Sequence, residues 1–214
     1  MPGAFKSGAF KSVSVTVFLA LSVLSACSAQ FQTAYPEASP VEARKEWRVS
    51  RVNVTVPDQL TTTEQNSFVP RADIVWHGDP PGDRRAQVAA VVKAGVEQGF
   101  EGLRGRENVV ASVTLRRFHA LTPKAFHRAP DDTGVHSVSF DLLITDARTG
   151  ATLAGPTLIE ADMPATMAAD LRNTPSAAPG PVWKKEIQSH IAATIRSWLG
   201  TGPDIRGTFN RLGA

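Results

Sequence analysis

The chain of 214 residues has one cysteine, one tyrosine and only 7% aromatic residues. A single cysteine, Cys27, cannot form a disulfide within the chain, so a disulfide-stabilised scaffold is excluded. The chain also lacks a transmembrane-length apolar run: its apolar segment Val13–Leu24 has 12 residues, whereas a bilayer-spanning helix needs about 20. The net charge is small as well, because 23 basic residues nearly balance 20 acidic ones. This balance argues against a nucleic-acid partner, since such proteins concentrate positive charge on one surface.

Motifs of known chemistry are missing too. The sequence contains no Gly-x-Ser-x-Gly, His-Glu-x-x-His, Walker phosphate loop or Cys-x-x-Cys pattern. The five histidines, at positions 77, 119, 127, 136 and 190, do not have the spacing of a common metal motif. We therefore predict no catalytic residues, no metal and no cofactor, and expect that the protein is not an enzyme. The histidines at 119, 127 and 136 surround a loop over Leu121–Gly134, where a metal or proton-switch site is the alternative to ordinary polar residues.

The amino terminus has the order of an export signal. Lys6 and Lys11 give the first 11 residues a positive charge without a carboxylate, and the apolar segment Val13–Leu24 follows. Next comes Leu24-Ser25-Ala26-Cys27, which resembles the lipobox of bacterial lipoproteins. The resemblance implies that residues 1–26 are a signal peptide removed before Cys27. It also implies that Cys27 carries a diacylglyceryl group and that its new amino group is acylated, with chains such as palmitate.

Lipidation of Cys27 would decide where the protein resides. Each buried methylene contributes about 0.8 kcal/mol and stable anchoring takes more than one chain, so two or three acyl chains would hold the protein on a membrane. The next residue is Ser28, whereas the inner-membrane retention signal of this family is typically aspartate. The resemblance thus implies the outer membrane, with the periplasmic face favoured over the cell surface. Loss of Lys6 and Lys11 leaves 21 basic and 20 acidic residues.

Composition divides the rest of the chain into three parts. Residues 27–44 are small and polar with Pro36 and Pro40, and we predict a flexible tether. Residues 45–200 hold the regular hydrophobic patterns and should form a single α+β domain. Residues 201–214 are rich in glycine and are predicted to be a flexible tail.

Hydrophobic periodicity predicts the elements of that domain. Alternation indicates strands over Trp47–Val56, with a bulge near Ser50–Arg51, over Asp73–His77, and around residues 109–115, 138–144 and 153–161. Three- and four-residue spacings predict helices over Arg84–Leu103 and Val182–Leu199, and Asp146–Gly150 is typical of a hairpin turn. We expect an α+β two-layer sandwich, a mainly antiparallel sheet with both helices packed on one face.

One local sequence is a candidate recognition loop. Residues 76–83 combine an aromatic ring, an imidazole and two carboxylates, Trp76, His77, Asp79 and Asp83, in a turn rich in proline and glycine. The alternative is that Trp76 anchors the core and the turn merely joins strand to helix. Burial is also favoured for Trp183 and Trp198, which lie on a regular apolar stripe. The pairs Arg84–Arg85 and Arg116–Arg117 are typical of solvated faces.

The order of elements from Trp47 to Leu199 resembles small periplasmic domains of envelope lipoproteins, including auxiliary lipoproteins of secretion and transport systems. It also resembles uncharacterised alphaproteobacterial lipoproteins grouped as a domain of unknown function. The leading hypothesis is a lipid-anchored, non-catalytic module that binds or scaffolds a protein or polymer of the envelope. An envelope hydrolase would need His77, Asp79 and Asp83 to converge in a cleft. A carrier of an apolar ligand would need an unfilled cavity between sheet and helices.

Overall fold

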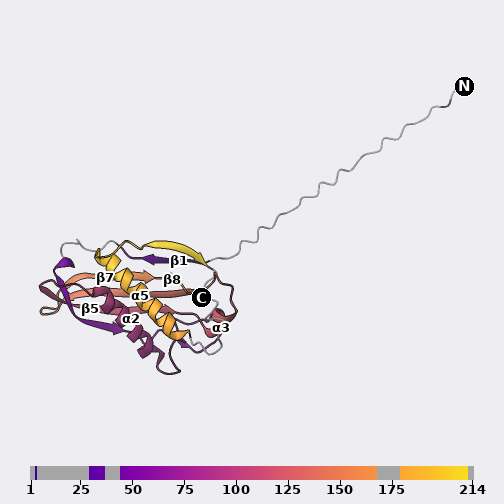
Figure 1. Cartoon of the computed structure of the whole chain (residues 1–214), viewed down its shortest axis with the longest axis horizontal. Helices are drawn as coiled ribbons and strands as arrows, with labels where there is room; N and C mark the ends of the chain where they lie inside the picture. The colour runs from indigo at the N-terminus through magenta and orange to yellow at the C-terminus, as the bar shows by residue number, and fades with distance from the viewer. Residues whose placement is uncertain (1–2, 4–28, 37–43, 168–178, 212–214) are drawn as a thin grey trace.

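The computed structural model describes residue 3 and residues 29–36, 44–167 and 179–211. In these segments a mixed sheet is crossed by two long helices, α2 (Arg84–Phe100) and α5 (Gly180–Leu199), which lie on the same side of it (Figure 1). Both helices agree with the predicted ranges to within three residues. The α+β class is therefore confirmed for the described part of the chain.

Within the described segments the sheet has nine strands. Their bounds are β1 (Ala29–Ala34), β2 (Trp47–Thr55), β3 (Thr62–Thr63), β4 (Ile74–Val75), β5 (Glu107–His119), β6 (Val135–Asp146), β7 (Thr152–Ala161), β8 (Met163–Pro164) and β9 (Gly207–Arg211). The main order is β3-β4-β5-β6-β7-β1-β9, while β2 pairs with β5 and β8 pairs with β6.

The meander β5-β6-β7 is antiparallel, as the alternating segments predict. Gly150 closes its second turn with a φ of 74°, in the left-handed region that glycine tolerates. The other half of the sheet is different, because β2 and β4 both run parallel to β5, and β3 runs parallel to β4. The crossover through α2 explains the parallel pairing of β4 with β5: a helix returns the chain to the end where the previous strand began, so both strands point the same way. The predicted bulge in β2 lies between Val49 and Arg51.

Two glycines allow α2 to pack closely on α5. A Cβ atom added at Gly95 would lie 2.9 Å from Cβ of Ile191, and one added at Gly99 would lie 2.5 Å from Cβ of Ile195. Both distances are shorter than van der Waals contact, so only glycine permits this helix separation. The cost in helix propensity, about 1 kcal/mol for each glycine, is thereby offset by closer packing.

Large side chains fill the space between the sheet and the helices. All four tryptophans, Trp47, Trp76, Trp183 and Trp198, are fully buried, and the inward residues of β5 and β6 pack among them. The preference for burial of Trp183 and Trp198 is confirmed. A tilted contact between Trp47 and Trp198, with ring centroids 6.3 Å apart, joins the start of β2 to the end of α5.

Two strands occupy segments predicted to be flexible. β1 falls in the expected tether and β9 in the expected tail, and they pair antiparallel with Ala29 opposite Arg211. Phe31 and Phe209 stack across this pair with ring centroids 5.7 Å apart. The predicted flexibility of these residues is therefore wrong. Each strand has six residues or fewer, too few for alternation to stand out, and each finds its partner only at the far end of the chain.

A short helix, α3 (Pro123–Arg128), lies in the predicted loop over Leu121–Gly134. Thr122 caps it by accepting a hydrogen bond from the Ala125 amide at 3.1 Å, and Pro123 begins its first turn. Among the helices of the described segments, none combines the length and the apolar character required to cross a membrane.

Candidate functional site

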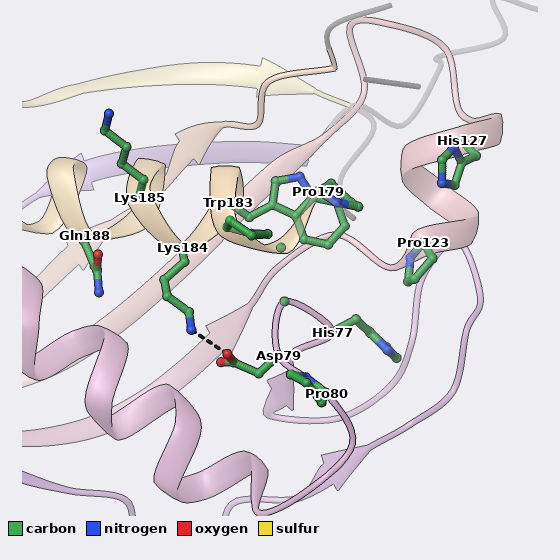
Figure 2. Close-up of a pocket in the computed structure, with 13 residues that line it drawn as sticks. His77, Asp79, Pro80, Pro123, His127, Pro179, Trp183, Lys184, Lys185 and Gln188 are labelled. Carbon is green, nitrogen blue, oxygen red and sulfur yellow. Dashed lines mark hydrogen bonds and ion pairs between the residues drawn. The ribbon is translucent and has the colours of Figure 1, made fainter. Parts of the chain in front are cut away.

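A cleft of about 740 Å³ opens where the loop after β4 meets α3 and the first turns of α5 (Figure 2). The predicted recognition loop forms one wall of it. The lining residues come from three segments far apart in sequence: His77, Gly78, Asp79, Pro80, Pro123, His127, Pro179, Gly180, Pro181, Trp183, Lys184, Lys185 and Gln188. Most of the lining is apolar; Lys184 points toward Asp79, whereas Lys185 points away from it (Figure 2).

Trp76 packs beneath this loop and fixes its position. Its ring is fully buried and meets Phe118 edge to face, with centroids 5.5 Å apart, so the interpretation of Trp76 as a core anchor is correct. Its indole Nε1 also donates a hydrogen bond of 2.8 Å to Oδ2 of Asp79. Core packing is thereby linked directly to the position of a cleft carboxylate.

Asp79 connects the loop to α5. Lys184 donates from Nζ to Oδ1 of Asp79 over 2.5 Å, and Figure 2 shows this ion pair across the cleft wall. Burial works against ionisation of Asp79, but the bonds from Lys184 and Trp76 outweigh it and keep the pKa of the carboxyl below its usual value. Asp79 is thus a charged structural link with both oxygens engaged.

Arg84 fixes the other end of the loop to α2. Its guanidinium makes two bonds to the Glu64 carboxylate, at 2.6 and 2.9 Å, and donates to the carbonyls of Asp79 and Pro80 at 3.0 and 3.2 Å. The residue is only 6% exposed, so the prediction of a solvated face is wrong for Arg84. The reason is that five donors in a planar fork satisfy loop carbonyls and a carboxylate together.

The loop contacts α5 at a second point, where backbone packs against backbone. A Cβ atom on Gly180 would overlap the backbone of Gly78, and one on Gly78 would overlap the Trp76 ring. The cleft wall therefore requires glycine at both positions. Such a wall is held in place before any ligand arrives.

The remaining loop residues have different roles. His77 lines the cleft and is half-buried; burial lowers the pKa of its imidazole, and Nε2 has no hydrogen-bond partner among the described residues. Asp83 is exposed and caps α2, accepting from the Ala86 amide at 3.1 Å. Asp83 does not line the cleft, and Asp79 is already bonded, so these groups do not converge as the hydrolase hypothesis requires.

The three histidines around the 121–134 loop are separated in the fold. His119 is bonded to the Ala72 carbonyl, His127 stands exposed on α3 beside the cleft, and His136 is buried in the core. Asp131 and Asp132 are exposed. Within residues 29–36, 44–167 and 179–211, no group of three or more His, Cys, Asp or Glu side chains is arranged to hold a metal.

Behind the cleft, His136 and Glu186 face each other in the core. Nε2 of His136 lies 3.6 Å from Oε2 of Glu186, and the imidazole packs against the Trp183 ring at a centroid distance of 5.9 Å. Burial lowers the pKa of His136, and the nearby carboxylate offsets this only in part. Trp183 thus contacts His136 and also lines the cleft.

Sequence reasoning found one wall of the cleft and missed the other. No sequence motif marks the residues of the second wall, Gly180, Lys184, Lys185 and Gln188. Lys184 is 105 positions away from its partner Asp79. The adjacent Gly180–Pro181 pair was the available signal, since a glycine beside a helix-starting proline allows close backbone approach. Cys27, the predicted lipidation site, lies outside the described residues.

Comparison with solved structures gives weak likenesses. A candidate lipoprotein from Caulobacter crescentus CB15 is 11% identical, with a TM-score of 0.38, covering 75% of this chain and 92% of that one. A PelC dodecamer from Paraburkholderia phytofirmans is 10% identical, with a TM-score of 0.27, covering 76% and 97%. A protein described as uncharacterized is 14% identical, with a TM-score of 0.34, covering 71% and 91%.

No curated protein matches the chain. A family model does: it matches residues 47–214, from the start of β2 onward, and so spans the cleft, both long helices and most of the sheet. The chain therefore belongs to the Family of unknown function (DUF6778).

Proposed function

We propose that this protein is an exported lipoprotein, held on a membrane by acyl chains on Cys27, which binds another envelope component without catalysis. The observation that carries the proposal is the order of a basic segment, a 12-residue apolar run, a lipobox and the single cysteine within the first 27 residues. A lone thiol in an oxidising compartment is reactive, and lipidation would block it. Ser28 after the cysteine favours the outer membrane, on its periplasmic face.

The cleft between residues 76–80 and the start of α5 is the proposed binding site. Its lining is mainly apolar, with Trp183 and several prolines, and it includes the Asp79–Lys184 pair and the exposed Lys185. Preformed concave sites with a few polar groups are typical of ligand recognition. A binding role is favoured over hydrolysis because the carboxylate of Asp79 is bonded to Trp76 and Lys184, and Asp83 caps a helix.

Replacement of Cys27 by serine tests the anchor. Cells expressing Cys27→Ser should lose metabolic labelling of the protein by an alkyne analogue of palmitate, and the protein should leave the lipidated membrane fraction. Ser28→Asp is the matched control for sorting: it should keep the label but move the protein to the inner membrane. Normal labelling of Cys27→Ser would refute the anchor, and an unchanged location of Ser28→Asp would refute the sorting step.

Site-directed photocrosslinking tests the binding site. A photoreactive phenylalanine analogue at Lys185, on the cleft rim, should capture a discrete envelope component in intact cells. The same analogue at Arg148, on the exposed β6–β7 turn, is the control and should not capture it. Equal capture from both positions would show that the cleft is not the site.

A further inference from the structure

The start of β1 determines which end of the domain lies nearest to Cys27. Ala29 is the first residue of β1 and lies two residues after Cys27. Two residues of extended chain span about 7 Å at most. If Cys27 is acylated, as the proposed function states, the start of β1 must therefore lie close to the lipid headgroups.

Several elements meet at that end of the sheet. Ala29 is opposite Arg211 at the end of β9, and Nη1 of Arg211 donates to the Gly134 carbonyl at 3.4 Å, in the loop that follows α3. Figure 1 shows the start of β1, the end of β9 and α3 together at one end of the molecule. The β6–β7 turn lies at the other end, because β6 runs from Val135, beside Gly134, to Asp146.

Exposed apolar side chains gather at the same end. Phe68 and Val69 are 45% and 63% exposed, and they are two of the three large hydrophobic residues exposed in the described segments. Their loop packs on α3: the Asn66 side chain accepts from the Lys124 amide at 2.8 Å, and Nζ of Lys124 lies 5.0 Å from the Phe68 ring centroid. An exposed pair of this kind favours insertion at a water–lipid boundary.

Basic residues lie in the same segments as this apolar pair or in the segments that adjoin them. We name the anchor end by its six residues: Phe68, Val69, Arg71, Lys124, Arg128 and Arg211. Its four basic residues outnumber the three carboxylates of the adjoining segments, Asp73, Asp131 and Asp132. Glu64, earlier in the first loop, is bonded to Arg84. The anchor end thus carries a local positive excess of one charge.

We infer that the anchor end docks on the surface of an anionic phospholipid bilayer, so that the domain is held against the membrane in one orientation. The short link to Cys27 brings this end to the surface, the basic residues attract anionic headgroups, and Phe68 and Val69 enter the interface. The inference rests on the proposed lipidation for its location in cells. The affinity of the anchor end for anionic lipid, however, is a property of the folded domain and can be measured separately.

Lysine footprinting measures the orientation. The lipidated protein is reconstituted in vesicles of phosphatidylethanolamine with phosphatidylglycerol, or with phosphatidylcholine alone, and treated with an acetylating reagent. Acetylation of Lys124 should fall about fivefold on the anionic vesicles, as expected for a contact of roughly 1 kcal/mol. Lys45, which is exposed and follows Arg44 at the α5 carboxyl end, should react equally in both. Equal reactivity of Lys124 in both vesicles would overturn the inference.

Charge reversal measures the affinity without lipid on the protein. The chain from residue 27 carrying Cys27→Ser is sedimented with anionic vesicles, alone and with Lys124→Glu plus Arg128→Glu. At about 1 kcal/mol for each basic residue, the double variant should bind at least tenfold more weakly. The matched control, Lys45→Glu plus Arg148→Glu, should bind like the parent, and circular dichroism should show that all three are folded. Equal weakening in both double variants would refute a specific docking end.

The two proposals fail in different ways. If Cys27 carries no acyl chain in cells but the Lys124 and Arg128 variant still loses vesicle binding, the anchor is wrong and the docking end is right. If Cys27 is acylated and the unlipidated chain does not bind anionic vesicles, the docking inference is wrong and the proposed lipid anchor is right. Protection of Lys124 in cells but not on vesicles would mean that a protein covers this end, which also refutes docking on lipid.

Discussion

Gly78 and Gly180 meet backbone to backbone, and a Cβ atom on Gly180 would overlap the carbonyl group of Gly78. This contact joins the loop after β4 to the first turn of α5, the two walls of the cleft. Gly78 has a second role, because a Cβ atom at this position would overlap the Trp76 ring that is buried beneath the loop.

Alanine at Gly180 should therefore destabilise the protein. Overpacking of a well-packed site costs roughly 1–3 kcal/mol, and here the clash is with backbone that cannot rotate away. Urea unfolding should show this loss for Gly180→Ala, while Gly207→Ala, where an added Cβ meets nothing within 4 Å, should unfold like the parent. Equal stability of the two variants would contradict the contact.

Arg84 should be far less replaceable than an exposed arginine. Arg84→Met leaves the Asp79 carbonyl without its donor, whereas the Pro80 carbonyl keeps its bond from Gln87; an unsatisfied buried group costs about 1–3 kcal/mol. Arg84→Lys should recover only part of this loss, because an ammonium cannot form the two-pronged bond to Glu64. The free energies of unfolding of the two variants give the comparison, and full recovery by lysine would show that the fork geometry is unimportant.

Gly99→Ala tests the close approach of α2 and α5. Alanine is favoured over glycine in a helix by about 1 kcal/mol, yet the new methyl would lie 2.5 Å from Cβ of Ile195. Because the clash costs roughly 1–3 kcal/mol, we expect a net loss of stability. Gln98→Ala, exposed on the same helix, should be neutral or slightly stabilising in the same thermal unfolding experiment. A stabilised Gly99→Ala would mean that the helices can separate at no cost.

Stability should fall in mild acid, in part through His136. Burial lowers the pKa of this imidazole, so the unfolded chain binds a proton more tightly than the folded one. The stabilisation is complete above about pH 6.5, the ordinary histidine value, and is lost as pH falls below it. The pKa of Glu186 also lies below its usual value, although burial opposes this, and its contribution is lost in the same direction.

His136→Leu removes the buried proton site and should flatten the pH dependence. The free energy of unfolding of the parent should drop more steeply than that of the variant between about pH 7 and pH 5. The half-buried histidines His77, His119 and His190 also have lowered pKa values and remain in both proteins. The difference between the two curves therefore reports His136 together with Glu186, whose pKa His136 helps to lower. Parallel curves would assign the acid sensitivity to the other groups.

The long periodic elements could be predicted from sequence because burial on one face leaves a repeating pattern. The valine stripe of α2, the isoleucine and tryptophan stripe of α5 and the alternation in β5 and β6 all correspond to observed buried faces. Gly95 and Gly99 lower helix propensity. From sequence alone, their role in close helix packing could be stated only as the condition under which a helix would tolerate them. The parallel pairing of β2 and β4 with β5 has no local signature, since it depends on the path of the whole crossover.

The cleft was half predictable for a related reason. Residues 76–83 stood out because tryptophan, histidine and two aspartates gather in a turn, but their roles are set by residues distant in sequence. Asp79 is held by Lys184, and Arg84 reaches back to Glu64. Asp83 belonged to the local pattern and has a purely local role as a helix cap. Short motifs therefore located the loop, whereas long-range ion pairs decide which of its groups are available.

Pairing of β1 with β9 has a practical consequence for reporter fusions. Any protein fused beyond Arg211 emerges beside Ala29, and a bulky fluorescent protein there would crowd the segment that joins Cys27 to the fold. An epitope inserted between Arg148 and Gly150 would instead stand at the far end of β6, a strand of 12 residues that spans about 40 Å. Proteins tagged in this turn should localise and behave more like the untagged protein than carboxyl-terminal fusions do.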